Sequence, residues 1–343
     1  MFRNRRARSI ENGTLRVTVL EEGGHIAEIL DKGSGVNPLW IPDWPSIEPS
    51  QYDPTTHAIY GNTAESSLLA GIMGHNLCLD IFGGPSVEEA AAGMPVHGEA
   101  SVARFEIDAS ETALCMHAML PMAQLHIERR IEVVHRTVHV RETVENLSGA
   151  DRPVGWTEHV TLGPPFLEKG TTQFRASGSR SKVYESVVGA HDYLEKGAEF
   201  DWPLAPRANG GVTDLRVCGD AERSSAYTAH LMDPVRDEAF FVAFSPRSRL
   251  AFGYVWRRMD FPWMGIWEEN YSRPAMPWNG RTLTRGFEFG VSPMPETRRQ
   301  MIERGRLFGV PTYRWISARQ RVTVDYRALL HPANAVPETL SAA

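Results

Sequence analysis

The sequence predicts an all-β fold, built as a sandwich or a barrel. Helical periodicity is scarce, whereas short runs that alternate apolar residues with other residues recur roughly every ten residues. Most of these runs end at Gly, Asn, Asp or Ser, the residues that turns favour. Regularly spaced short strands separated by turns are typical of antiparallel β architectures.

The first predicted element is a hairpin near the N-terminus. Leu15, Val17 and Val19 alternate with polar residues, as expected for a strand with one buried face. Glu-Glu-Gly-Gly at 21–24 turns the chain, and residues 25–30 lead back. We therefore expect two antiparallel strands to open the fold.

Strand-like segments are densest between residues 99 and 145, where polar breaks separate apolar runs. The neighbouring antiparallel strands expected there are 102–107, 113–119, 125–134 and 137–144. Later candidates are 240–244, 250–254, 287–291 and 321–329. The last of these can close the sheet at the C-terminus.

The chain is long for one domain, but large β-sandwiches commonly exceed about 200 residues as one unit. Its 343 residues are 42% hydrophobic and 23% charged, which provides enough apolar material for a large core. Residues 38–76 and 189–211 lack a sustained period, as functional loops or loosely held surface do. No linker marks a boundary, so we expect one domain over residues 1–343. Residues 1–10, which hold a basic run, are expected to form a frayed tail.

Charge and cysteine content exclude several classes of protein. Lys and Arg total 36 against 42 Asp and Glu, so the formal net charge of −6 gives no attraction to phosphate backbones or anionic membranes. We therefore expect neither nucleic acid nor a membrane as a partner. Neither a secretory signal nor an apolar stretch of ~20 residues is present, which predicts a cytoplasmic protein. Cys78, Cys115 and Cys218 are odd in number and widely spaced, which indicates neither a disulfide framework nor a zinc site.

Two of three clusters with titratable side chains contain a histidine near a strand end. Gly and Pro surround His97 just before a strand, so its imidazole is expected at the rim of a sheet. In the strand that follows an Asn-Leu-Ser turn, alternation puts Trp156 and Glu158 on one face and Thr157 with His159 on the other. Gly-Pro-Pro then ends that strand, so His159 should project from a rigid strand end. A structural role stays open for either histidine.

The third cluster is the apolar segment 285–291, in which Glu288 stands between two aromatic residues. Charged residues are rarely buried without a partner, so a carboxylate in this setting is a functional candidate. His135 and His139 lack an HExxH pattern, and they indicate a solvated strand face rather than a zinc site.

The order of these motifs resembles the galactose mutarotase-like superfamily, which includes the aldose 1-epimerases. In that superfamily a His-Gly step, a later Asn-Leu-Ser turn followed by a strand-borne His, and a C-terminal strand-borne Glu occur in this order. The present chain has His97-Gly98, then Asn-Leu-Ser at 146–148 with His159, and finally Glu288. The resemblance spans most of the chain. It implies a large, mostly antiparallel β-supersandwich that binds a small carbohydrate without a cofactor or a metal.

The resemblance also implies roles for individual residues. His159 is expected to act as general acid and Glu288 as general base, while His97 helps to bind and polarise the sugar. A Gly-His-Asn sequence lies about where relatives carry an Arg or Asn that contacts sugar hydroxyls, which makes His75 and Asn76 candidate contacts. The family's usual Gly-Arg-x-x-Asn pattern is absent, so the chain resembles a divergent branch.

A further segment, 263–270, occupies the region where relatives carry a strand that lines the groove. There Trp267 can offer a flat face to a pyranose ring, and Glu269 can accept hydrogen bonds from its hydroxyls. Two core tryptophans next to exposed acids are the alternative interpretation.

The residue types suit the interconversion of sugar anomers, and the resemblance predicts an aldose 1-epimerase-like isomerase. A base removes the proton of the anomeric hydroxyl while an acid protonates the ring oxygen, and rotation followed by reclosure gives the other anomer. A carboxylate and an imidazole on opposite sides of the ring suffice. Two alternatives stay open: a non-catalytic carbohydrate-binding or sensing protein, and a lyase or hydrolase on the same scaffold.

Overall fold

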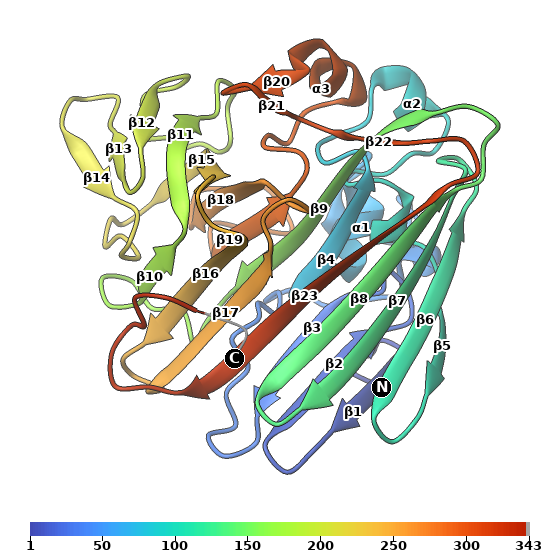
Figure 1. Ribbon diagram of the computed structural model, residues 1–343, viewed down its shortest axis with the longest axis horizontal. Coiled ribbons are helices and arrows are strands. Elements are labelled where there is room, and N and C mark those ends of the chain that lie inside the picture. Colours follow the sequence, from blue (N-terminus) through green and yellow to red (C-terminus); the bar gives the residue numbers. More distant parts are fainter. Residues whose placement is uncertain (341–343) are drawn as a thin grey trace.

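Two large antiparallel sheets form most of the protein, whose computed structural model describes residues 1–340 (Figure 1). The eleven-stranded first sheet has the spatial order β1 (Ala7–Glu11), β2 (Leu15–Leu20), β3 (Ile26–Asp31), β4 (His75–Asp80), β9 (Arg152–Leu162), β19 (Leu283–Gly290), β18 (Trp263–Asn270), β15 (Ser224–Met232), β11 (Gly178–Val183) and β12 (Glu199–Asp201), with β22 (Arg314–Ile316) also paired to β9. The eight-stranded second sheet has the order β10 (Gln173–Ala176), β16 (Glu238–Ser245), β17 (Leu250–Arg257), β23 (Arg321–Pro332), β8 (Thr137–Asn146), β7 (Leu125–Val134), β6 (Ala113–Leu120) and β5 (Glu106–Ala109).

Short elements complete the structure. Two small hairpins pair β13 (Leu204–Pro206) with β14 (Val212–Asp214) and β20 (Arg306–Leu307) with β21 (Val310–Pro311). The helices are α1 (Ser66–Gly71), α2 (Val87–Ala91) and α3 (Arg298–Arg304), with 3₁₀ turns at Pro49–Gln51, Ala58–Tyr60 and Glu99–Ser101. In Figure 1, α2 and α3 lie together at the upper end of the molecule.

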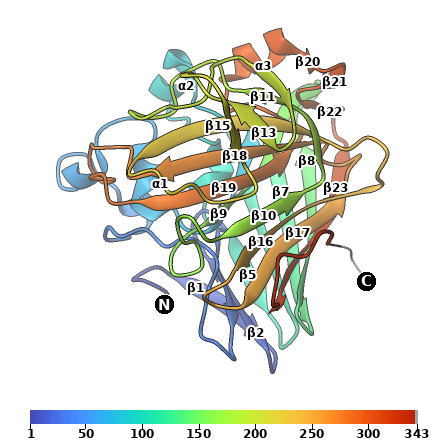
Figure 2. The same ribbon diagram turned by 90° about the vertical axis from the view of Figure 1, so that its left-hand side faces the viewer.

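The main core lies between the two sheets, whose strands cross steeply in Figure 2. In β7 and β8 buried and more exposed residues alternate, so only one face of the second sheet is buried. The central strands of the first sheet differ, because every residue of β4, β15, β18 and β19 is buried. These strands therefore carry a covering layer on each face.

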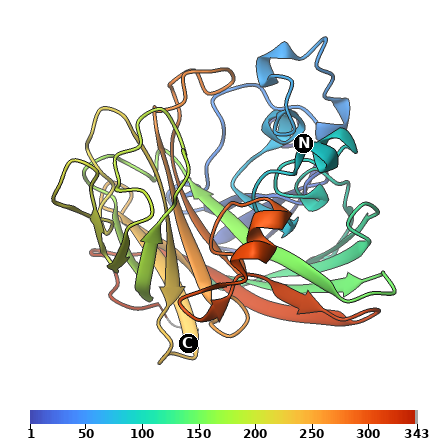
Figure 3. The same cartoon turned by 90° about the horizontal axis from the view of Figure 1, so that it is seen from above.

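The outer covering layer comes from segments outside the sheets. In Figure 3 the blue chain that follows β3 and the yellow-green hairpins lie on opposite sides of the central strands. The members of one buried apolar cluster on this outer side include Trp40, Trp44, Leu68, Leu69, Trp267 and Trp278. Residues 38–76, expected to be functional loops or loosely held surface, thus include the packed helix α1 and part of a buried core.

The prediction of a mostly antiparallel all-β fold is confirmed, as are the N-terminal hairpin and the strands predicted from residues 113, 125 and 137. The strand predicted at 102–107 is wrong over most of its length, because β5 begins only at Glu106. Gly98 before it has a positive φ, and a Cβ there would lie 2.0 Å from the Leu79 carbonyl oxygen, so the chain turns sharply at this point. The predicted strand 321–329 lies inside the second sheet, between β17 and β8, and does not close its edge.

The N-terminal residues are not a frayed tail, which corrects that prediction. Arg5 is fully buried, and its Nε lies 2.8 Å from Glu48 Oε2. Its Nη2 also donates to the Glu22 carbonyl oxygen at 2.9 Å, and β1 pairs with β2 directly after it. A buried guanidinium keeps its charge only where carboxylates and carbonyls satisfy it, so these contacts fix the start of the chain.

Candidate functional site

The register of three neighbouring strands aligns polar residues in one row. His159 on β9 lies opposite Asn76 on β4 and opposite Glu288 on β19. Side chains of directly paired residues project to the same side of a sheet. All three therefore belong to the face that turns away from the second sheet, and the sequence-predicted separation of His159 from Glu158 onto opposite faces is observed.

Within this row the imidazole and the carboxylate are in direct contact. His159 Nε2 lies 2.9 Å from Glu288 Oε1, and His159 Nδ1 lies 3.0 Å from Thr161 Oγ1. His159 is 5% exposed and Glu288 is 2% exposed, so both are nearly buried. The two groups were expected on opposite sides of a sugar ring. They instead form an adjacent pair, because strand register brings them side by side.

A cavity of about 240 Å³ contains this pair in its wall. The volume is slightly below the range of about 300–1,000 Å³ that is typical of drug-sized ligands, which suits a small ligand. Other side chains in the wall are His97, Trp267, Trp278, Tyr184, Tyr227, Arg273 and Glu65. Titratable groups thus converge with aromatic surface, as in many small-molecule sites.

His97 reaches the cavity from the turn before the Glu99–Ser101 helix. Its backbone has a φ of 68°, and its Nδ1 lies 2.5 Å from the Phe82 carbonyl oxygen. Because a carbonyl only accepts, Nδ1 carries the proton and Nε2 is left as an acceptor. Burial, followed by the nearby His159, lowers the pKa of His97 to about 3. A neutral His97 can accept a hydrogen bond from a ligand hydroxyl.

Aromatic side chains and one arginine form another part of the cavity wall, where the Trp267 ring lies 5.8 Å from the His159 ring between centroids. The guanidinium of Arg273 lies over Trp267 at 5.4 Å and over Trp278 at 4.8 Å from the ring centroids. Its nitrogens also approach Glu65 at 3.6 Å and Glu269 at 3.5 Å. Trp267 therefore lines the cavity as expected, but Arg273 covers one of its ring faces.

Glu269 holds the part of the site that contains Arg273. Its Oε1 accepts hydrogen bonds from the backbone nitrogens of Ser272 at 2.6 Å and Arg273 at 3.0 Å. Burial raises the pKa of its carboxyl group. Since Glu269 is 1% exposed, it fixes the turn that carries Arg273, and the expected contact with ligand hydroxyls does not fit its position.

The expected contacts of His75 and Asn76 do not fit the structure either, because both side chains are fully buried. His75 points between the sheets, where its Nδ1 lies 3.0 Å from the Tyr254 hydroxyl. Asn76 shares the row of His159, but its Nδ2 lies 3.7 Å from Cys78 Sγ beneath the cavity wall. Every residue of β4 is buried, so neither strand face exposes a side chain there.

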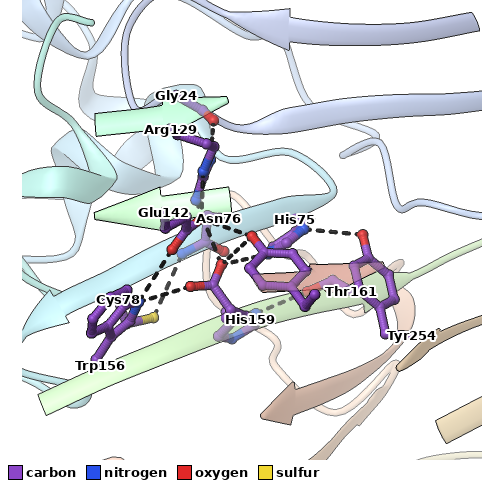
Figure 4. A network of polar contacts seen from close by, with 12 residues as sticks. Gly24, His75, Asn76, Cys78, Arg129, Glu142, Trp156, His159, Thr161 and Tyr254 are labelled. Carbon is purple, nitrogen blue, oxygen red and sulfur yellow. Dashed lines mark hydrogen bonds and ion pairs between the residues drawn. The ribbon is translucent and has the colours of Figure 1, made fainter. Parts of the chain in front are cut away.

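His75 belongs to a second histidine–glutamate pair, inside the core (Figure 4). Its Nε2 lies 2.9 Å from Glu158 Oε2, and Arg129 Nη2 lies 3.5 Å from the same oxygen. Arg129 Nε also contacts Glu142 Oε1 at 2.5 Å, and the Tyr326 hydroxyl lies 2.7 Å from that oxygen. The pKa of Glu142 rises to about 7, mainly through burial and against the attraction of Arg129.

Another hollow, of about 490 Å³, lies on the outer side of the second sheet. Charged side chains line it, and several pair with one another, such as Arg141 with Asp325 at 2.7 Å and Arg130 with Glu132 at 2.7 Å. Exposed ion pairs of this kind are ordinary surface chemistry. The smaller cavity at His159 is the candidate site, because unlike the outer hollow it joins a buried acid–base pair to aromatic walls. Across residues 1–340, no helix has the length and apolar character needed to span a bilayer.

Sequence reasoning missed Thr161 and Glu65, and it did not distinguish Arg273 from ordinary surface arginines. Thr161 follows His159 by two residues, so strand alternation alone places it on the same face and could have found it. Arg273 and Glu65 come from irregular segments that carry no periodic signal, and only the fold brings them to one cavity.

At the sequence level, no family model matches the chain and no curated protein matches it significantly. Solved structures match its shape. A candidate aldose 1-epimerase from Escherichia coli K12 has a TM-score of 0.64 at 13% identity, over 95% of this chain and 99% of that chain. A candidate aldose 1-epimerase from Klebsiella pneumoniae has a TM-score of 0.64 at 12% identity, over 93% of this chain and 77% of that chain. A galactose mutarotase related enzyme from Lactobacillus acidophilus has a TM-score of 0.60 at 11% identity, over 97% of this chain and 100% of that chain. The chain therefore has the galactose mutarotase-like β-sandwich fold.

Proposed function

We propose that the protein is an aldose 1-epimerase-like isomerase that interconverts the anomers of a small sugar or sugar derivative. The observation that carries this proposal is the contact of 2.9 Å between His159 Nε2 and Glu288 Oε1 in the wall of a cavity of about 240 Å³. A fold alone does not establish an activity, so the proposal depends on this site.

The reaction needs one acid and one base at neighbouring atoms. The anomeric hydroxyl oxygen and the ring oxygen are bonded to the same carbon, so two adjacent side chains can reach both. Glu288 takes the hydroxyl proton, and His159 in its imidazolium form donates the Nε2 proton to the ring oxygen. The ring opens to the aldehyde, and after rotation about one carbon–carbon bond both protons return as the other anomer closes.

The remaining cavity residues suit a polyhydroxy ligand. His97 Nε2 is an acceptor, because its Nδ1 proton points to the Phe82 carbonyl oxygen. Arg273 and Glu65 offer donors and acceptors elsewhere in the cavity wall, where Arg273 lies over Trp267. Aromatic rings that carry polar neighbours are suited to the C–H faces and hydroxyls of sugars.

One feature of the site resembles the catalytic groups of a hydrolase. Thr161, His159 and Glu288 form a line of hydroxyl, imidazole and carboxylate, the order of groups found in nucleophilic triads. Thr161 is only 1% exposed and lies outside the cavity wall, however, so its oxygen cannot attack a ligand. This burial favours proton transfer by His159 and Glu288 over covalent catalysis.

Exchange NMR of anomers across neutral and anionic sugars tests the proposal. We expect wild type to accelerate exchange for at least one sugar, and Glu288→Gln or His159→Ala to reduce that rate by about 10²–10⁴-fold. His126→Ala, on the outer face of the second sheet, is the matched control and should keep the wild-type rate. Binding of a sugar without any acceleration would instead identify a carbohydrate-binding protein, and release of a new reducing end would identify a hydrolase.

A further inference from the structure

Thr161 is the only hydrogen-bond partner of His159 Nδ1 among the described residues, and it contributes a hydroxyl. Its Oγ1 lies 3.0 Å from Nδ1, next to it on β9 and on the same strand face. A threonine hydroxyl can donate its own proton or accept one, and rotation about one bond exchanges the two roles. A carboxylate or a carbonyl in this place would accept only.

His159 needs both roles if it transfers protons. In the neutral resting pair, Nε2–H donates to Glu288, and Nδ1 must then accept a hydrogen bond. In the imidazolium both nitrogens carry protons, and after Nε2 gives its proton away Nδ1 keeps its own. The partner of Nδ1 must therefore donate in the first state and accept in the other two.

We propose that Thr161 is a positioning residue whose hydroxyl donates to Nδ1 when Nε2 alone carries a proton and accepts from Nδ1–H in the other two states, so that Nδ1 keeps a partner throughout and retains its proton while Nε2 gives its own to the sugar. This inference rests on the proposed function for its catalytic meaning. The hydrogen-bond reversal itself is a property of the pair and can be measured without any substrate.

Other charged or titratable groups surround His159 and must be counted. Glu288 contacts it from β19, and the ring of His97 lies 5.2 Å from its ring between centroids. Cys78 of β4 lies two residues from the row of His159, while His75 and Glu158 lie on the other face of the sheet. Burial keeps His97 neutral. Among the described residues none of these groups is in hydrogen-bond contact with Nδ1, so Thr161 is its partner in every protonation state.

Two substitutions at Thr161 can test the role of its hydroxyl. Thr161 lies opposite Gly286 on β19, which carries no side chain, and it is buried at 1% exposure. Thr161→Val therefore replaces the hydroxyl by a methyl group of similar size and keeps the β-branched shape. Thr161→Ser keeps the hydroxyl and removes the methyl group. The two variants separate hydrogen bonding from packing.

The test is an NMR titration of His159 through its imidazole ¹⁵N shifts, in wild type, Thr161→Val and Thr161→Ser. Loss of the hydroxyl leaves the imidazolium Nδ1–H unpaired, which costs more than an unpaired lone pair. We expect Thr161→Val to move the midpoint of this titration to lower pH by about one unit or more relative to wild type, because the charged form loses a hydrogen bond. We expect Thr161→Ser to restore the wild-type value.

Activity supplies the second measurement. If the proposed function is right, Thr161→Val lowers the anomer exchange rate about 10-fold or more, and Thr161→Ser recovers most of it. An unchanged His159 titration in a folded Thr161→Val protein would overturn the inference, whatever the activity. A shifted titration together with no exchange in wild type would overturn the proposed function and leave the hydrogen-bond reversal intact.

Discussion

Two histidine–glutamate pairs lie on opposite faces of the same sheet, and each has a nitrogen–oxygen separation of 2.9 Å. His159 and Glu288 face outward, into a cavity of about 240 Å³. His75 and Glu158 face inward, where the second sheet seals them among fully buried side chains. His159 and Glu158 are consecutive residues of β9, so one step along a strand separates a candidate reaction centre from a core contact.

The surroundings of the two pairs explain the difference between them. The inner pair has a fixed cation, Arg129, and the hydroxyl of Tyr254 on the far side of its histidine. The pKa of His75 falls well below its usual value, mainly through burial. The outer pair has a neutral hydroxyl as its only further partner within residues 1–340 and open volume beside it. The two pairs have the same residue types and the same nitrogen–oxygen distance. They differ in access to a cavity and in the presence of a neighbouring cation, and these two differences decide which pair can react with a ligand.

The inner pair should matter for stability more than for activity, and Arg129→Met tests this. Removing the guanidinium leaves Glu142 and Glu158 without their cation, and breaking a buried ion pair in this way costs about 3–5 kcal/mol of unfolding free energy. Urea denaturation measures the loss. Arg141→Met is the matched control, because its pair with Asp325 is exposed and should contribute about 1 kcal/mol or less. Equal stabilities of the two variants would contradict the comparison, as would lost anomer exchange in folded Arg129→Met.

The protonation of the inner network gives stability a defined pH dependence. The folded state raises the pKa of Glu142 from 4.5 to about 7, so it favours the protonated form. That contribution is complete below pH 4.5 and is lost as the pH rises through about 7. Glu142→Gln imitates the protonated form at every pH.

Its stability relative to wild type should therefore increase between pH 4.5 and about 7, by at most about 3 kcal/mol. Urea unfolding of both proteins at several pH values in this window measures the difference. Burial lowers the pKa of His25 to about 3, and this group works in the opposite direction, but it is common to both proteins and cancels. A difference that stays constant across the window would show that Glu142 is ionised in the folded protein.

Strand alternation predicted the separation of the two pairs where the pattern was clear. It put Glu158 and His159 on opposite faces of one strand, which the register confirms. It could not assign faces to His75 and Asn76, because β4 is covered on both sides and shows no alternation between apolar and polar residues. Only the resemblance predicted that both residues line the site. In the structure both are fully buried beneath it.

The contact between His159 and Glu288 depends on strand register, which sequence periodicity does not provide. The residues are far apart in sequence, and a shift of one residue between β9 and β19 would send one side chain to the other face. Arg273 lies in a turn after the end of β18, and Glu269 holds that turn. The alternation of residues within the strand therefore could not predict that Arg273 lines the cavity. Local alternation predicted the strands and their faces. Which residues meet in the site depends on how the strands pair and where the turns lie, and alternation does not predict either.

The smallest expected effect concerns the glycine beside the outer pair. A Cβ on Gly286 would lie 2.7 Å from Glu288 Oε1 and 3.3 Å from Trp267 Cβ. The carboxylate is the flexible end of its side chain, so Gly286→Ala should displace it from His159 while the strand still forms. We expect anomer exchange to fall about 10-fold, equivalent to about 1.4 kcal/mol, with a change in unfolding free energy of about 1 kcal/mol or less. Gly13→Ala, where a Cβ meets nothing within 4 Å, is the control and should leave exchange unchanged. Wild-type exchange in Gly286→Ala would mean that the position of Glu288 beside His159 is not what the reaction uses, and the outer pair would then be no more functional than the inner one.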